Sequence, residues 1–143
     1  MKPILLSLFI VSFIACNSNQ TSTTEPYAKE RATVKTDAVA TYTETESNGD
    51  SSKTFKVQLF EQKESLSYEV KFSYNGASSE KIFSYPNMHM MPKPGLKKGP
   101  APMSCIVGFY DADSVFMDLR LIAVEKGTLV YRHLKEYSVP AAK

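Results

Sequence analysis

An unbroken alternation of apolar and polar side chains over residues 66–74 constrains the fold of this chain more than any other feature. The two alternating sets are Leu66, Tyr68, Val70, Phe72 and Tyr74 on one side and Ser67, Glu69, Lys71 and Ser73 on the other. Successive side chains of a strand point to opposite faces of a sheet, whereas a helix repeats about every 3.6 residues. The pattern therefore predicts a strand with one buried face, followed by a tight turn at Asn75-Gly76.

The same period of two recurs along most of the chain. Further strands are predicted near residues 39–45, 55–59, 80–85, 104–110, 115–123 and 129–139. Short turns join antiparallel neighbours, and strands that each have one apolar face must cover one another. We therefore expect an all-β fold: one antiparallel domain of about seven strands over residues 33–140, arranged as a sandwich or in a barrel-like form.

The first sixteen residues follow a different pattern. Met1-Lys2 supplies a positive start, and Ile4 to Ala15 then contains no charged side chain. As a helix this run would be about 18 Å long, which is too short for a bilayer core of about 30 Å. Its length and position are typical of the apolar region of a secretory signal peptide. We expect residues 1–15 to be removed from the mature protein.

The apolar run ends in Phe13-Ile14-Ala15-Cys16. This sequence resembles the lipobox of bacterial lipoproteins, in which a small residue precedes a cysteine that receives diacylglycerol and becomes the first residue. The resemblance covers residues 1–16 and implies that Cys16 anchors the protein to a membrane. Because Asn17, and not Asp, follows the cysteine, it also implies a place in the bacterial cell envelope, on the outer membrane facing the periplasm.

Between Cys16 and the β domain, residues 17–32 are polar and lack periodic apolar positions. This composition predicts a flexible tether. If Cys16 carries lipid, Cys105 has no disulfide partner within the chain, which contains two cysteines. Cys105 lies in an apolar run, so we expect a buried, unreactive thiol, with a reactive or metal-binding thiol as the alternative.

Charge and motifs disfavour two classes of function. The 17 basic residues nearly cancel the 15 acidic ones, so the chain has no electrostatic basis for binding nucleic acid. We find no nucleophile elbow, phosphate loop or dinucleotide fingerprint, and two histidines leave few anchors for a catalytic triad. We expect a protein that is not an enzyme and that has no cofactor.

Residues 86–103 depart from the average composition of the chain. This stretch holds five of the eight prolines and four of the six methionines, together with three lysines and no acidic residue. Proline lacks the N–H group that a central strand needs, so we predict a long loop, and such loops are often functional. The candidate partner-binding residues in it are Met88, His89, Met90, Met91, Lys93, Lys97 and Lys98.

Three interpretations of this loop remain open. In the first, its methionines form a flap that covers an open end of the core. In the second, the loop is an adaptable surface that recognises a protein partner. In the third, thioether and imidazole groups bind Cu(I), for which the candidate ligands are Met88, His89, Met90 and Cys105.

We favour a membrane-anchored, non-catalytic lipoprotein whose β domain binds a partner through the loop at 86–103. A copper-binding lipoprotein of the periplasm is one alternative. A carrier of a hydrophobic ligand is another, and it requires that the β layers enclose a cavity.

Overall fold

The computed structural model describes residues 26–137, and within them the chain forms eight strands and no helix. The strands are β1 (Ala40–Asn48), β2 (Ser51–Glu61), β3 (Ser67–Tyr74), β4 (Ala77–Ser84), β5 (Lys93–Lys98), β6 (Ser104–Tyr110), β7 (Phe116–Glu125) and β8 (Thr128–His133). The expected all-β, antiparallel fold is confirmed. The signal peptide, Cys16 and residues 17–25 of the expected tether lie outside the described residues.

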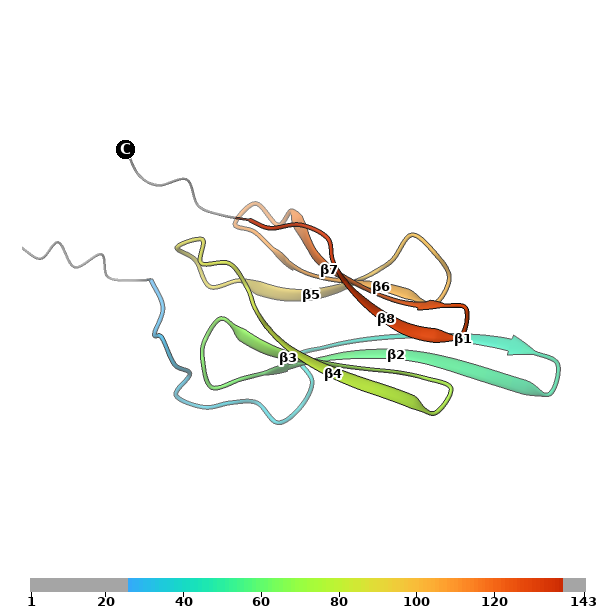
Figure 1. The fold of residues 1–143 in the computed structure, drawn as a ribbon. Coiled ribbons are helices and arrows are strands. Elements are labelled where there is room, and N and C mark those ends of the chain that lie inside the picture. The colour runs from blue at the N-terminus through green and yellow to red at the C-terminus, as the bar shows by residue number, and fades with distance from the viewer. Residues whose placement is uncertain (1–25, 138–143) are drawn as a thin grey trace, which may run out of the picture.

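The strands pair in chain order in two four-stranded sheets, β1-β2-β3-β4 and β5-β6-β7-β8 (Figure 1). The edge strand β1 lies beside β5, and β4 lies beside β8. Within the described part of the chain no ladder of hydrogen bonds joins one sheet to the other. Of the two arrangements that the sequence left open, the structure is therefore a sandwich.

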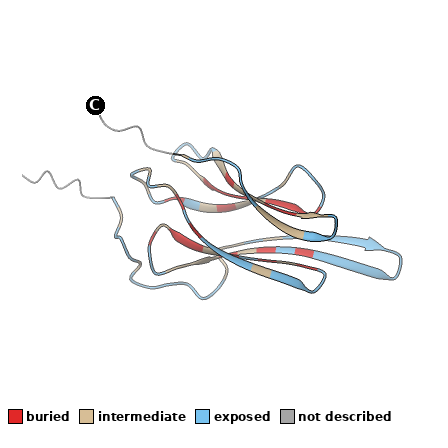
Figure 2. Ribbon diagram, in the orientation of Figure 1, coloured by how far each residue is buried: buried red, intermediate tan, exposed pale blue. Residues whose placement is uncertain are grey.

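Both sheets contain buried residues (Figure 2), whose hydrophobic side chains form one core cluster between the sheets. The most deeply buried include Phe55, Val57 and Leu59 of β2, Tyr68 and Val70 of β3, Cys105, Val107 and Phe109 of β6, and Ile122 of β7. Along β2 and β3 these residues alternate with more exposed ones, as the period of two predicts. Full burial of such an apolar side chain contributes about 1.5–3 kcal/mol, so the core is the main source of stability.

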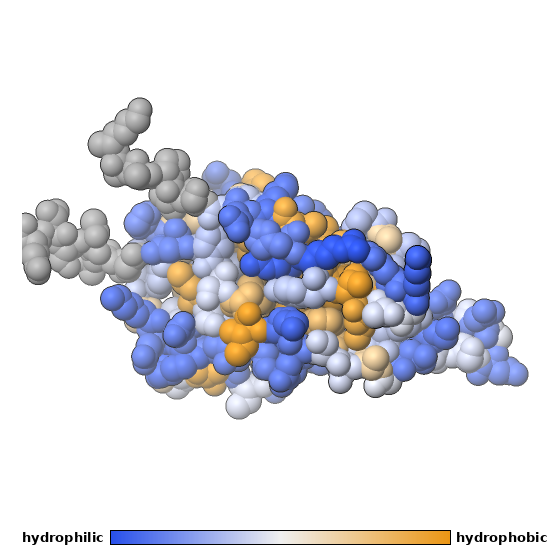
Figure 3. All heavy atoms as spheres, in the orientation of Figure 1, coloured by the Kyte–Doolittle hydropathy of each residue, from blue (hydrophilic) through white to orange (hydrophobic). Residues whose placement is uncertain are grey.

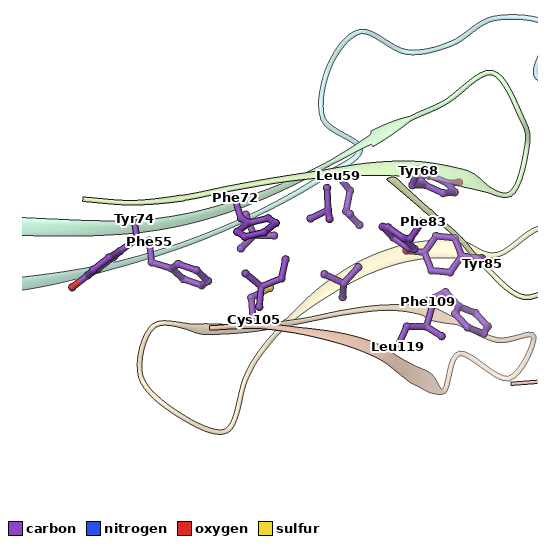
Figure 4. Close-up of a cluster of buried hydrophobic side chains, with 14 of the residues drawn as sticks. Phe55, Leu59, Tyr68, Phe72, Tyr74, Phe83, Tyr85, Cys105, Phe109 and Leu119 are labelled. Carbon is purple, nitrogen blue, oxygen red and sulfur yellow. The ribbon is translucent and has the colours of Figure 1, made fainter. Parts of the chain in front are cut away.

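Tyr85 connects the two sheets through a buried hydrogen bond. It follows β4 directly, and its hydroxyl donates to the backbone oxygen of Gly108 on β6 at 2.7 Å. Its ring makes edge-to-face contacts with Tyr68, Phe83 and Phe109, with ring centroids 4.9, 5.2 and 5.4 Å away (Figure 4). Burial raises the pKa of the Tyr85 phenol, so the hydroxyl stays protonated and remains a donor.

Residues 86–103 do not form one long loop, and that prediction was wrong. Residues 86–92 connect the sheets, β5 occupies 93–98, and a turn at 99–103 leads into β6. β5 is an edge strand that pairs only with β6. An edge strand tolerates proline because the N–H groups on its outer side need no partner, which explains Pro94.

The last two strands of the second sheet, β7 and β8, also differ from the expected pattern. β7 contains a register shift: Val107 of β6 pairs with Arg120 and Gly108 pairs with Asp118, so Leu119 is an extra residue. Beyond the shift, Ile122 is buried, and Leu121 pairs with Ile106 on the outer face of the sheet. β8 ends at His133, earlier than the predicted end at residue 139.

Part of the expected tether is attached to the β domain at the turn between β2 and β3. The backbone N–H of Arg31 donates to Lys63, and the N–H of Ser65 donates to Lys29. The Arg31 guanidinium lies 4.6 Å from the centroid of the Tyr68 ring. It also donates hydrogen bonds to the backbone oxygens of Gln62, Glu64, Ser65 and Ser67.

Arg31 fixes the N-terminal segment to this turn. Its side chain is only 8% exposed and donates hydrogen bonds to several carbonyl groups at once. We predict that Arg31→Ala lowers the free energy of unfolding by about 2–3 kcal/mol, since it removes these donors and the contact with Tyr68. Urea denaturation measures the loss. Lys63→Ala is the control, because Lys63 belongs to the same turn but its side chain is 62% exposed. We expect this variant to lower the free energy of unfolding by about 0.5 kcal/mol. An equal decrease in the free energy of unfolding of the two variants would contradict this role of Arg31.

Candidate functional site

The outer face of the second sheet carries two aromatic rings where β5, β6 and β7 lie side by side. Tyr110 at the end of β6 pairs with Phe116 at the start of β7. Their ring centroids are 5.1 Å apart in an edge-to-face arrangement, which is a favourable geometry for two aromatic rings. We call the surface formed by Lys93, Gly95, Lys97, Gly108, Tyr110 and Phe116 the lysine–aromatic face.

Two glycines support these rings. Gly95 of β5 and Gly108 of β6 pair across the sheet. A Cβ atom on Gly95 would lie 2.8 Å from Cε2 of Tyr110, and one on Gly108 would lie 2.8 Å from Cζ of Phe116. A Cβ on Gly108 would also lie 2.2 Å from the backbone oxygen of Met117. The rings therefore rest directly on the backbone, and a larger residue at either position would displace them.

Two lysines of β5 lie over the rings. The Nζ atom of Lys93 is 5.9 Å from the ring centroid of Tyr110, and that of Lys97 is 5.4 Å from the ring centroid of Phe116. Contacts of this kind are worth about 0.5–1 kcal/mol at exposed sites. Both lysines are exposed, whereas both rings are half-buried. The face thus presents two ammonium groups beside apolar ring surface, which is a combination that binds carboxylates next to apolar side chains.

Lys98, the third lysine predicted to bind a partner, lies where the edges of the two sheets meet. Its Nζ is 4.0 Å from Oε1 of Glu44 on β1. Glu44 also accepts a hydrogen bond from the Tyr42 hydroxyl at 2.8 Å. Burial, helped by this bond, raises the pKa of Tyr42 to about 12. Lys98 therefore contributes to the contact between the sheets and does not share a face with Lys93 and Lys97.

The methionines of residues 86–92 divide between the core and the surface. Met88 is half-buried and packs against the core, as the flap interpretation expects, whereas Met91 is 41% exposed. His89 is exposed, has a φ of 55°, and donates its backbone N–H to Oδ1 of Asn87 at 3.0 Å. Met90, next in the chain, is half-buried.

Cys105 is buried in the core at the other end of β6. It pairs with Lys98, whereas Tyr110 pairs with Lys93, which follows the methionine segment. Five residues of a strand span about 17 Å, so the structure does not bring Cys105 together with Met88, His89 and Met90. Burial raises the pKa of the Cys105 thiol to about 12, which keeps it neutral at ordinary pH. Among residues 26–137 no three His, Cys, Asp or Glu side chains are grouped to hold a metal ion.

The carrier alternative requires an apolar cavity between the sheets. The buried side chains shown in Figure 4 occupy that space. A depression of about 380 Å³ is lined by Tyr27, Leu66 and Asn87, among other residues, at the N-terminal segment and outside the core. This arrangement does not favour a carrier.

Sequence reasoning missed four members of the lysine–aromatic face. Tyr110 and Phe116 flank a short turn, so their approach across a hairpin was open to prediction. The contacts of Gly95 could not be predicted from the sequence. The residues nearest to it belong to β6 and β7, and its own segment was predicted to be a loop. Gly108 lies in the predicted strand at 104–110. A glycine inside a strand is a sign that another group approaches its backbone closely.

No protein-family model, curated protein or solved structure matches this chain. Across residues 26–137 there is no helix with the length and apolarity needed to cross a membrane.

Proposed function

We propose that this protein is a lipid-anchored, non-catalytic binding protein of the bacterial cell envelope. Cys16 is the anchor, which places the β sandwich on the periplasmic side of the outer membrane. The support for the anchor is the sequence of residues 1–16, with its apolar run and its Ala15-Cys16 ending. The binding role rests on the lysine–aromatic face.

The observation that carries the binding role is the layering of that face. Lys93 and Lys97 project over Tyr110 and Phe116, and the rings are held in place on two glycines. Rigid aromatic rings supply contact area with little loss of conformational entropy, and they are enriched at protein interfaces. A protein surface that combines carboxylates with apolar side chains fits this arrangement. The proposed binding element is therefore no longer the whole of residues 86–103. It is β5 together with the adjoining parts of β6 and β7.

On the outer face of the first sheet, unlike on the lysine–aromatic face, the lysine that lies over a strand pairs with acidic residues. Lys71 on β3 lies 3.4 Å from Glu69 and 3.9 Å from Glu80, so acidic groups of the same face neutralise it. Exposed ion pairs of this kind contribute little to stability or recognition. Lys71 also lies over a ring, 5.3 Å from the centroid of Phe60, so it is the neutralisation of its charge that favours the second sheet as the binding side of the sandwich.

Lipid attachment is tested by expressing the chain in a bacterial host that processes lipoproteins. The host is grown in medium that contains an alkyne-bearing palmitate analogue. We predict that the wild-type chain is labelled and that Cys16→Ser is not, because the thiol that forms the thioether is absent. Cys105→Ala serves as the matched control and should keep its label, since that thiol is buried. Undiminished labelling of Cys16→Ser would refute the anchor.

The binding side is tested by placing the photo-crosslinking residue benzoylphenylalanine at position 97 or at position 56 in the protein's native bacterium. Lys56 is an exposed lysine on the outer face of the first sheet, so it controls for charge and exposure. We predict a discrete protein adduct from position 97 and none from position 56. Lys93→Glu should reduce that adduct about tenfold, which corresponds to about 1.4 kcal/mol, whereas Lys56→Glu should leave it unchanged. The same adducts from both positions would overturn the assignment.

A further inference from the structure

The strand order gathers one set of connections at a single end of the sandwich. Because every strand is antiparallel to the next, the connections at 62–66, 86–92 and 111–115 lie at the end where β8 finishes (Figure 1). Residues 28–31 are bound to the 62–66 turn, so they lie at this end as well. We call it the anchor end. The opposite end, with the turns at 49–50, 75–76, 99–103 and 126–127, is the distal end.

Exposed hydrophobic side chains concentrate at the anchor end. Three of them are Met91 in the 86–92 connection, Val115 in the 111–115 connection and Leu134 in the segment after β8, and they are 41%, 54% and 40% exposed. Val34 is 40% exposed and is followed by Lys35, whose backbone N–H donates to the Glu61 carboxylate at the end of β2. Isolated exposed hydrophobic residues are ordinary, but their recurrence on separate segments of the chain at one end is a sign of an interaction surface.

The distal end has the opposite character. Its turns consist of Gly, Asp, Asn, Lys, Pro and Ala together with the buried Met103, and no large hydrophobic side chain is exposed in those turns. In Figure 3 the protruding tip of the hairpin formed by β1 and β2 is hydrophilic. The two ends of the sandwich therefore differ in what they can contact.

The chain between Cys16 and the sandwich joins it at the anchor end. The backbone oxygen of Ala28 accepts a hydrogen bond from the Ser65 hydroxyl, which marks where the bound segment begins. Asn17 to Ala28 are twelve residues, which can extend over at most about 40 Å. β2 alone has 11 residues and is about 36 Å long. To bring the distal end to the membrane, this segment would have to run along nearly the whole sandwich.

We infer that the anchor end of the sandwich rests on the lipid surface, with Met91, Val115 and Leu134 in the interfacial region of the bilayer. This inference rests on the proposed lipidation of Cys16. The lipid chains would hold the domain at the membrane, so weak contacts suffice to orient it. In that orientation the strands stand away from the bilayer. The lysine–aromatic face, whose Lys93, Tyr110 and Phe116 lie at the anchor end, then looks sideways close to the lipid surface.

The test uses the full, lipidated chain in vesicles of phosphatidylethanolamine and phosphatidylglycerol. An environment-sensitive nitrobenzoxadiazole probe is attached to Val115→Cys, Leu134→Cys or Asp50→Cys, while Cys105 stays shielded in the core. Asp50 is the control, an exposed residue in the turn between β1 and β2. Nitroxide-labelled phospholipids should quench the probes at 115 and 134 at least about twofold more than the probe at 50.

Flotation of the vesicles separates this inference from the proposal on which it rests. If the protein fails to float with the vesicles, the lipid anchor is absent and both proposals fall. If it floats but the probes at 115 and 134 are quenched no more than the probe at 50, the anchor stands and the membrane contact is overturned.

Discussion

The buried hydrogen bond from Tyr85 to Gly108 is the interaction on which the rest of the sandwich depends. Each sheet is a simple meander that pairs only with its own neighbours, so packing alone must fix one sheet on the other. A hydroxyl inside an apolar core has to find an acceptor, and here the acceptor is a backbone oxygen of the opposite sheet. This bond gives a direction and a register to the buried part of an interface that is mainly apolar and therefore non-directional, whereas the Lys98–Glu44 pair lies at its edge.

Contacts on either side of Tyr85 extend from the anchor end to the candidate binding face. Arg31 lies over Tyr68, whose ring packs against Tyr85, and Tyr85 binds Gly108. Gly108 in turn lies beneath Phe116. Residues 28–31 and the proposed binding surface are thus held by the same core. This arrangement suits the proposed role, in which one face is held at a fixed orientation to a lipid anchor.

Sequence reasoning succeeded where one face of a strand is buried, as in β3, because period-two alternation reports that burial directly. It failed at β5, where a proline and a glycine resemble a loop although an edge strand tolerates them. The period of two also could not show the extra residue Leu119, beyond which Ile122 is buried and Leu121 lies on the outer face. The role of Arg31 was not predictable, because its partners are backbone oxygens more than thirty residues along the chain.

The most direct test of this account is Tyr85→Phe, followed by urea denaturation and by the NMR resonances of the Phe116 ring. The account predicts a loss of about 1–3 kcal/mol and a shift of those resonances, since Gly108 lies between the two residues. Tyr42→Phe is the control, because the bond from Tyr42 to Glu44 lies at the partly exposed edge between β1 and β5. It should lose less stability and leave Phe116 unchanged. Equal stability of the two variants, with no shift at Phe116 in either, would contradict the account.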